Sequence, residues 1–261
     1  MSNRRYEGQI REQGDTVHVT SIADPTVRPY DKNTDLTTED LDDEQVSLTV
    51  DQGAYFSFRV NDVDRVQSAG DFQGPATQRA GHRLADGLDR YAAGLYTGVD
   101  PANNLTPATE GTVTPIDVSN PATAYDVLVA LAVLLDKSDC PSIGRYVVIS
   151  PDFHGKLQSD DRFARVDASG SDETLRNGIV GRAAGFDVLK SNNTPSPAAG
   201  QQVVQAGIPD SFSVAEQITQ TEALRAQARF ADIVRGLHVY GAKLFEPTGI
   251  AVATVTVPAG M

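Results

Sequence analysis

The chain has 261 residues, of which 40% are hydrophobic and 22% charged, and its formal net charge at pH 7 is −13. This length allows a sizeable core, and the composition fits a soluble globular protein rather than a disordered or collagen-like one. The acidic balance argues against sequence-independent nucleic-acid binding, which needs clustered Lys and Arg. No apolar run approaches the roughly 18 residues that span a bilayer, and the single cysteine, Cys140, excludes a disulfide framework.

The first 62 residues predict β structure. Residues 16–22 and 46–50 alternate apolar and polar side chains with the period of a half-buried strand, and residues 54–60 are rich in aromatic and β-branched side chains. Residues 24–44 hold two prolines and many acids but few large apolar residues. We expect this segment to project from the body as a long excursion between strands, and a loop of about 20 residues usually has a function.

A long helix is predicted after Pro75, a residue that suits the first turn of a helix. Apolar side chains then recur in steps of three and four, which places one stripe along the helix, and Gly98 ends the pattern. The stripe consists of Ala76, Ala80, Leu84, Leu88, Tyr91, Ala92 and Leu95. Residues 99–121 follow as a linker rich in Pro, Thr, Asn and Gly, which is the best candidate for a domain boundary.

Residues 122–207 predict a compact α/β unit. We expect helices at 122–135 and 151–157, and strands at 145–149, 186–189 and 203–206. The last 50 residues return to β structure, with strands expected at 214–224, 230–234, 237–245 and 250–257.

Motifs that carry catalysis are absent. The chain has no GxGxxG, no Walker loop, no HExxH and no GxSxG. The four histidines are not spaced as a metal pair, and His18 and His238 lie in alternating strands, where a structural role is favoured. Acid clusters at 42–44, 160–161 and 172–173 lie in polar segments, where solvated surface is favoured over acid–base chemistry. We therefore expect no catalytic, cofactor-binding or metal-binding residues, and no enzyme activity.

Several segments carry a resemblance to a known family. Residues 213–223 and 229–243, together with 3–8 and 90–96, resemble the major capsid (coat) proteins of tailed double-stranded-DNA phages, in particular those of siphophages that infect actinobacteria. The matches run in order along nearly the whole chain, although none of them is diagnostic alone. The resemblance implies an α+β fold of the Hong Kong 97 type, with an extended β-hairpin loop, a peripheral domain that contains a long spine helix, and an axial α/β domain.

The resemblance also implies a division of the chain. Residues 1–14 correspond to a remnant of an N-terminal arm, 15–60 to the extended loop, 61–115 and 211–261 to the peripheral domain, and 116–210 to the axial domain. The implied function is self-assembly into the hexamers and pentamers of an icosahedral head that encloses double-stranded DNA without sequence-specific binding. No cofactor and no membrane are implied. Scaffold, portal and decoration proteins are implied partners, and the expected location is the virion capsid, with the host cytoplasm during assembly.

Acids of the projecting loop are candidates for contacts between subunits, because a dense acidic cluster needs cationic partners. We predict that Asp40, Asp42, Asp43 and Glu44 face arginines on the long helix of a neighbouring subunit. The candidate partners are Arg65, Arg79, Arg83 and Arg90.

Three alternatives stay open at this stage. The first is an encapsulin-type nanocompartment shell, which shares the fold but encloses enzymes. The second is a β-rich binding module that is monomeric in solution. The third, an enzyme that uses the acid clusters, is the least favoured because no motif supports it.

Overall fold

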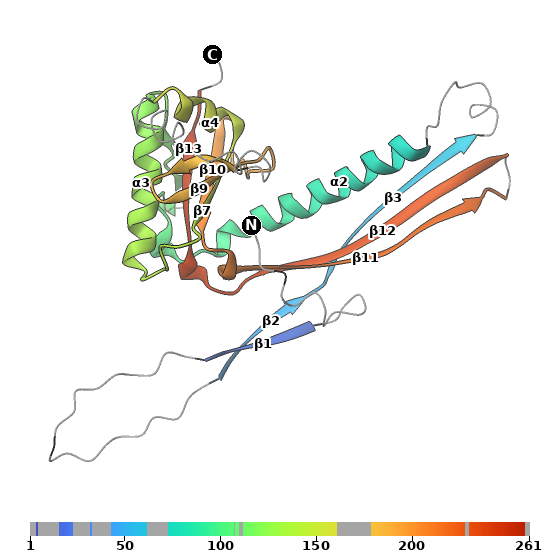
Figure 1. The fold of residues 1–261 in the computed structure, drawn as a ribbon, viewed down its shortest axis with the longest axis horizontal. Helices are drawn as coiled ribbons and strands as arrows, with labels where there is room; N and C mark the ends of the chain where they lie inside the picture. The colour runs from blue at the N-terminus through green and yellow to red at the C-terminus, as the bar shows by residue number, and fades with distance from the viewer. Residues whose placement is uncertain are drawn as a thin grey trace.

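The computed structural model describes residue 4, residues 16–22, residue 32, and residues 43–61, 73–106, 108–109, 112–160, 179–227 and 230–258. Figure 1 shows three parts: a compact α/β unit, an elongated unit made of one long helix and long strands, and a β-hairpin that projects away from both. The molecule is therefore far from spherical, and much of its surface belongs to thin extensions.

The compact unit is built on a six-stranded mixed sheet. Its strand order is β6 (Ile116–Asp117), β13 (Ile250–Thr256), β10 (Gln201–Gly207), β7 (Tyr146–Ile149), β9 (Phe186–Lys190) and β8 (Ile179–Ala183). The pairs β6–β13 and β7–β9 are parallel and the others are antiparallel. Helices α3 (Pro121–Lys137) and α4 (Pro151–Gln158) contribute to the hydrophobic core on one face of this sheet (Figure 1).

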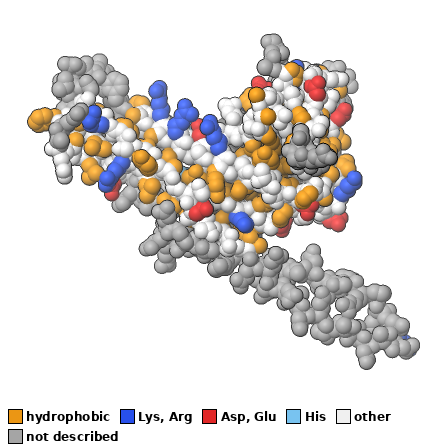
Figure 2. Space-filling model, turned by 180° about the vertical axis from the view of Figure 1, so that it is seen from behind, with side chains coloured by type: hydrophobic (Ala, Val, Ile, Leu, Met, Phe, Trp, Pro, Cys, Tyr) orange, Lys and Arg blue, Asp and Glu red, His pale blue; other side chains and the backbone are white. Residues whose placement is uncertain are grey.

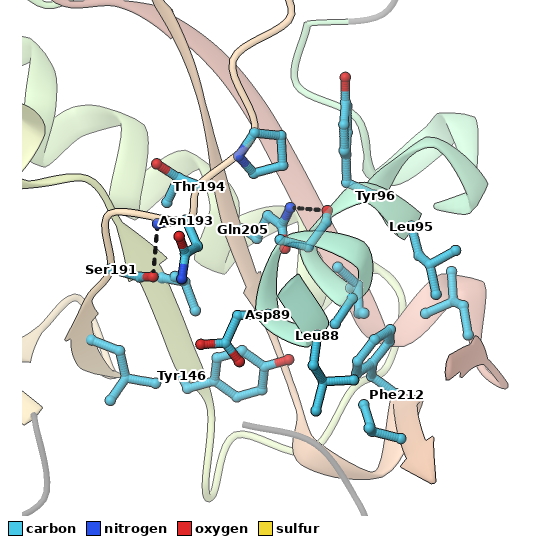
Figure 3. A pocket seen from close by; sticks show the side chains of 18 of the residues that line it. Leu88, Asp89, Leu95, Tyr96, Tyr146, Ser191, Asn193, Thr194, Gln205 and Phe212 are labelled. Carbon is cyan, nitrogen blue, oxygen red and sulfur yellow. Dashed lines mark hydrogen bonds between the residues drawn. The ribbon is translucent and has the colours of Figure 1, made fainter. Parts of the chain in front are cut away.

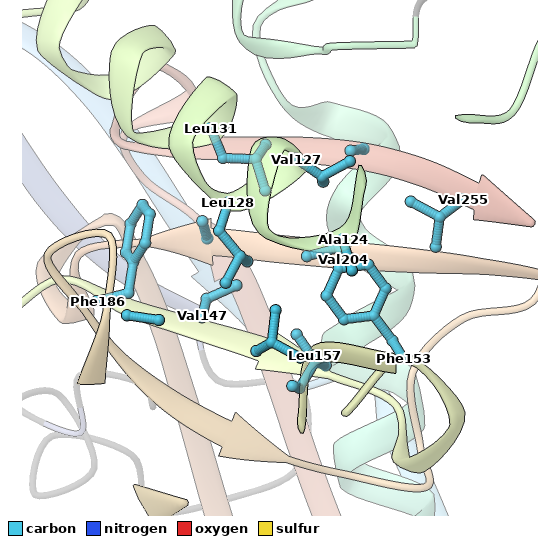
Figure 4. Close-up of a cluster of buried hydrophobic side chains, with 14 of the residues drawn as sticks. Ala124, Val127, Leu128, Leu131, Val147, Phe153, Leu157, Phe186, Val204 and Val255 are labelled. Carbon is cyan, nitrogen blue, oxygen red and sulfur yellow. The ribbon is translucent and has the colours of Figure 1, made fainter. Parts of the chain in front are cut away.

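Local sequence explains how α3 begins and which face it buries. The side chain of Asn120 accepts a hydrogen bond from the amide of Ala122 at 3.1 Å, and Pro121 occupies the first helical position, as in many helix starts. Leu128, Leu131 and Leu135 are completely buried, because steps of three and four bring them to one side of the helix. Figure 4 shows Leu128 and Leu131 meeting the side chains of the sheet and of α4.

The elongated unit is a three-stranded antiparallel sheet with a helix along one face. The sheet has the order β11 (Phe212–Arg225), β12 (Ala231–Leu244), β3 (Gln52–Asn61), and the helix is α2 (Gln73–Gly94) (Figure 1). Tyr91 of α2 meets Tyr240 of β12 edge to face, with ring centroids 5.6 Å apart. A second cluster, which includes Leu88, Tyr240, Val203 and Val252, joins this unit to the compact one.

The projecting hairpin consists of β1 (Thr16–Ile22) and β2 (Asp43–Thr49), paired antiparallel. At its base, Leu48 and Val50 are completely buried against Ala215 and Val239. Ala215 and Val239 lie on the face of the three-stranded sheet opposite α2, since Val239 alternates with the helix-facing Tyr240. An isolated two-stranded hairpin is only marginally stable in water. The packing of Leu48 and Val50 on the sheet therefore holds the base of the hairpin in place.

Short elements connect these parts. They are the 3-10 turns η2 (Leu95–Gly98), η3 (Pro101–Asn103), η5 (Pro209–Ser211) and η6 (Pro247–Gly249), and the two-residue strands β4 (Ala108–Thr109) and β5 (Thr112–Val113). The segment expected as a plain linker at 99–121 therefore contains ordered turns and strands. The long helix ends four residues earlier than expected, at Gly94, and η2 continues the chain to Gly98.

Most expected elements are confirmed, with one further difference among the strands. The strands expected at 230–234 and 237–245 form one strand, β12. Strand β13 pairs with β10 in the compact unit, and the division implied by the resemblance places all of 211–261 in the peripheral domain. Strand β3, which the same division places in the extended loop at 15–60, pairs with β12. The reason in the case of β13 is that it is buried along almost its entire length, as suits an inner strand of a covered sheet.

Candidate assembly surfaces

Three of the predicted contact residues form a basic stripe on α2. Arg79, Arg83 and Arg90 are all exposed, and their spacing of four and seven residues keeps them within about 40° of one another around the helix axis. Figure 2 shows Lys and Arg side chains along the edge of the elongated unit, above a surface with many hydrophobic side chains. We call Arg79, Arg83 and Arg90 the arginine stripe.

Contacts inside the subunit leave the arginine stripe largely uncommitted. Arg83 Nη1 lies 3.8 Å from Asp86 Oδ2, and both side chains are substantially exposed. Arg90 Nε donates a hydrogen bond to Asn193 Oδ1 at 3.1 Å. Exposed ion pairs contribute about 0–1 kcal/mol, so the pair with Asp86 does not prevent the Arg83 guanidinium from binding another partner.

The predicted acids lie in another part of the molecule. Asp43 and Glu44 open β2, where they pair with Ile22 and Ser21 of β1, while Asp40, Asp42 and Arg65 lie outside the described residues. In Figure 1 the hairpin and the outer end of α2 extend in opposite directions. The structure therefore does not bring Asp43 or Glu44 to the arginine stripe of the same subunit.

An amide that the sequence analysis did not single out ties α2 to the compact unit. Asn193 Nδ2 donates to Asp86 Oδ1 at 3.3 Å, and Asn193 Oδ1 accepts from Arg90. Nearby, Gln205 Nε2 donates to the carbonyl oxygen of Ala93 at 2.7 Å. A surface loop rich in Pro, Ser and Ala gave no signal for this role, because the partner helix lies about 100 residues earlier in the chain.

A cleft of about 320 Å³ lies beside these contacts, between the last turns of α2 and the compact unit. Figure 3 shows Leu88 and Asp89 of α2 and Tyr146 and Gln205 of the six-stranded sheet around it. Burial raises the pKa of Tyr146 to about 12, so its phenol stays protonated at neutral pH. The cleft has no arrangement of nucleophile, base and acid that would indicate catalysis among its described residues.

A charged contact fixes Arg4 to the elongated unit. Arg4 forms an ion pair with Glu216 of β11, and His238 Nε2 of β12 lies 3.4 Å from the other carboxylate oxygen of Glu216. His238 is buried and packs against Tyr240, with ring centroids 5.2 Å apart. The structural role expected for His238 therefore agrees with its position.

The described residues give no support for a metal site or for a reactive thiol. Across the described ranges there is no group of three or more His, Cys, Asp or Glu side chains placed to hold a metal ion. Burial raises the pKa of the Cys140 thiol, which disfavours the reactive thiolate. Within the same part of the chain, none of the helices has the length and apolar character needed to cross a membrane.

Comparison with known proteins identifies the family. A chain from Mycobacterium phage Che8 shares 32% sequence identity with this one over 96% of this chain and 88% of that chain, with a TM-score of 0.76. The family described as phage capsid protein matches residues 43–253. The chain belongs to the phage capsid protein family. No curated protein matches the chain.

More distant capsids share the fold of this capsid protein. The capsid of Ralstonia phage GP4 matches with a TM-score of 0.70 at 12% identity, covering 100% of this chain and 87% of that chain. The capsid of cyanophage P-SCSP1u matches with a TM-score of 0.69 at 16% identity, covering 95% and 85%. The expected α+β fold class and the resemblance to phage coat proteins are thus confirmed.

Family membership decides between the functions left open by the sequence. The chain is a major capsid protein of a phage head, a structural protein of the virion capsid that assembles into an oligomeric shell. The nanocompartment shell and the monomeric binding module are not favoured. Contacts between copies of the chain are therefore expected at exposed surfaces such as the hairpin and the arginine stripe.

Proposed function

We propose that this capsid subunit builds the hexamers and pentamers of its icosahedral head through a contact between the acidic hairpin of one copy and the arginine stripe of the next. The observation that carries the proposal is geometric. Asp43 and Glu44 open β2 of the hairpin, the stripe lies on α2, and the hairpin and the outer end of α2 extend in opposite directions within one subunit, which supports a contact between copies. The acids of this contact are Asp40, Asp42, Asp43 and Glu44, with Arg65 as a further basic candidate beside the stripe.

The strength of such a contact fits a reversible assembly. Each exposed ion pair contributes roughly 0.2–1 kcal/mol, which is weak for one contact. A shell repeats the contact in every subunit, and repeated weak contacts give a stable closed container. Because charges screen over about 8 Å at physiological salt, the contact also makes assembly sensitive to ionic strength.

The parts of the subunit take the roles implied by a Hong Kong 97-type capsid. The compact unit serves as the axial domain that meets its copies at the centre of each capsomer, and the elongated unit with α2 serves as the peripheral domain. The hairpin serves as the extended loop. Support comes from the layout in Figure 1, in which one compact body carries two long extensions.

The shell encloses double-stranded DNA without reading its sequence, and the subunit acts as a structural protein rather than as an enzyme. A net charge of −13 supports enclosure without adhesion, because an acidic protein repels DNA. Assembly takes place in the host cytoplasm, with scaffold, portal and decoration proteins as further partners. No cofactor takes part.

A charge swap tests the contact. Reversal of the hairpin acids (Asp42→Lys with Asp43→Lys) should abolish closed particles in electron micrographs and leave soluble subunits on size exclusion. Reversal of the stripe (Arg79→Glu with Arg83→Glu) should do the same. Combining all four substitutions should restore particles, since opposite charges face each other again. Normal particles from the hairpin variant alone would contradict the proposal.

A further inference from the structure

Two polar side chains in the cleft between α2 and the compact unit have no partner among the described residues. Tyr146 of β7 lines the cleft and is only 7% exposed, and its raised pKa is caused by burial alone, without a contribution from a hydrogen bond. The carboxylate of Asp89 of α2 also lines the cleft. Figure 3 shows both side chains, and neither carries a dashed hydrogen bond. A buried hydroxyl without a partner costs about 1–3 kcal/mol, so the Tyr146 hydroxyl indicates that a further molecule completes this site.

Many of the other side chains that line the cleft are apolar. Leu88 and Ala92 come from α2, Val148 and Leu189 from the six-stranded sheet, and Phe212 from the start of β11. The volume of about 320 Å³ lies at the lower end of the range of small-molecule sites, which is roughly 300–1,000 Å³. The cleft therefore suits a small ligand with an apolar body and one polar end.

The charges at the cleft favour a cation as that polar end. Arg4 lines the cleft, but its positive charge is compensated by the ion pair with Glu216. Lys190 also belongs to the lining, but its side chain shares a face of β9 with Val188, which is buried in the core beneath α3, because the two are two residues apart. The negative charge of Asp89 is therefore uncompensated, and a chain with a net charge of −13 attracts cations at long range.

From these observations we propose that the cleft binds a primary aliphatic amine in its charged form. An ammonium group has three donors and no acceptor, so it donates to the carboxylate of Asp89 and to the hydroxyl oxygen of Tyr146. Hydrogen bonds between two charged groups are the stronger kind, and the alkyl chain packs against Leu88, Ala92 and Phe212. Because Asp89 belongs to α2 and Tyr146 to the compact unit, the bound amine connects the two units of the subunit.

Calorimetric titration of the unassembled subunit at pH 7 tests the proposal, with n-pentylammonium as the probe. We expect saturable binding at one site per subunit. Pentan-1-ol keeps the alkyl chain without the charge, methylammonium keeps the charge without the chain, and pentanoate reverses the charge. Each of these three should bind at least tenfold more weakly than n-pentylammonium. No saturable binding of n-pentylammonium, or an affinity no higher than that of any of the three, would overturn the proposal, whatever the charge swap of the hairpin and the stripe shows.

Three variants locate the binding in the cleft. Asp89→Asn should weaken the affinity for n-pentylammonium at least tenfold, because it removes the charge and keeps the shape of the side chain. Tyr146→Phe should weaken it at least threefold, because it removes only the hydroxyl. Glu246→Gln is the matched control: it removes one negative charge from an exposed residue outside the cleft and should bind like the parent. Parent-like affinity of Asp89→Asn, or an equal loss in Glu246→Gln, would refute the site, and urea unfolding at pH 7 checks that all three variants are folded like the parent.

Discussion

The packing of the hairpin base against the three-stranded sheet can be tested by a substitution that adds a single methyl group. Gly241 of β12 lies directly beneath the turn from β2 to β3. A Cβ at this position would overlap the carbonyl oxygen of Thr49 and would come within 3.0 Å of both the carbonyl carbon of Thr49 and the Cα of Val50. These are backbone atoms, so no side-chain rotation can relieve the overlap. Gly241→Ala must therefore push the hairpin base away from the sheet.

The cost follows from what the hairpin base buries. Leu48 and Val50 are completely buried in this contact, and burial of each side chain contributes about 1.5–3 kcal/mol. Overpacking in a well-packed site typically costs about 1–3 kcal/mol. We expect Gly241→Ala to lower the free energy of unfolding of the unassembled subunit by about 3 kcal/mol, which corresponds to a fall in Tm of roughly 6–12 °C for a chain of this size.

The assay combines urea unfolding with hydrogen exchange. Urea gives the change in free energy, and exchange at the amides of residues 43–50 reports whether the hairpin base has opened. Gly81→Ala is the matched control: it makes the same substitution on α2, where no atom lies within 4 Å of the new Cβ, and should stabilise the helix by about 1 kcal/mol. If Gly241→Ala unfolds within about 0.5 kcal/mol of the parent, with unchanged exchange, the close approach does not hold the hairpin.

Two further predictions concern the junction of the compact and elongated units. Asn193→Ala removes both hydrogen bonds of the amide to α2 and should lower the free energy of unfolding by about 1 kcal/mol; urea unfolding that matches the parent would rule out this role. Tyr146 has a pKa of about 12 in the folded chain against 10.0 without burial, because burial disfavours the phenolate. Its contribution to stability is complete below pH 10 and is lost as the pH rises toward 12, by up to about 2.7 kcal/mol. Tyr146→Phe should remove that part of the alkaline loss, and unfolding curves at pH 9 and 11.5 that change equally in the two proteins would refute the assignment.

Local patterns in the sequence determined most of the elements. The apolar stripe that ends in Leu95 predicted α2, and the alternation in residues 250–257 predicted β13, because the period of the apolar residues follows directly from backbone geometry. The segments that resemble phage coat proteins follow one another in the same order along the chain, and this was enough to predict a phage coat protein and its α+β fold. The arginine stripe could also be predicted from the sequence, since helical spacing alone places the side chains of Arg79, Arg83 and Arg90 on one side of the helix.

Tertiary structure decided which strands pair and which surfaces remain open. Strand β13 joins the compact unit and β3 joins the elongated one, because pairing depends on distant partners whose identity no local pattern contains. The role of Asn193 could not be found from the sequence for the same reason. Tyr55 and Leu48 are both large apolar residues of expected strands, and only the packing of β2 against β12 shows that Leu48 is completely buried whereas Tyr55 is 80% exposed.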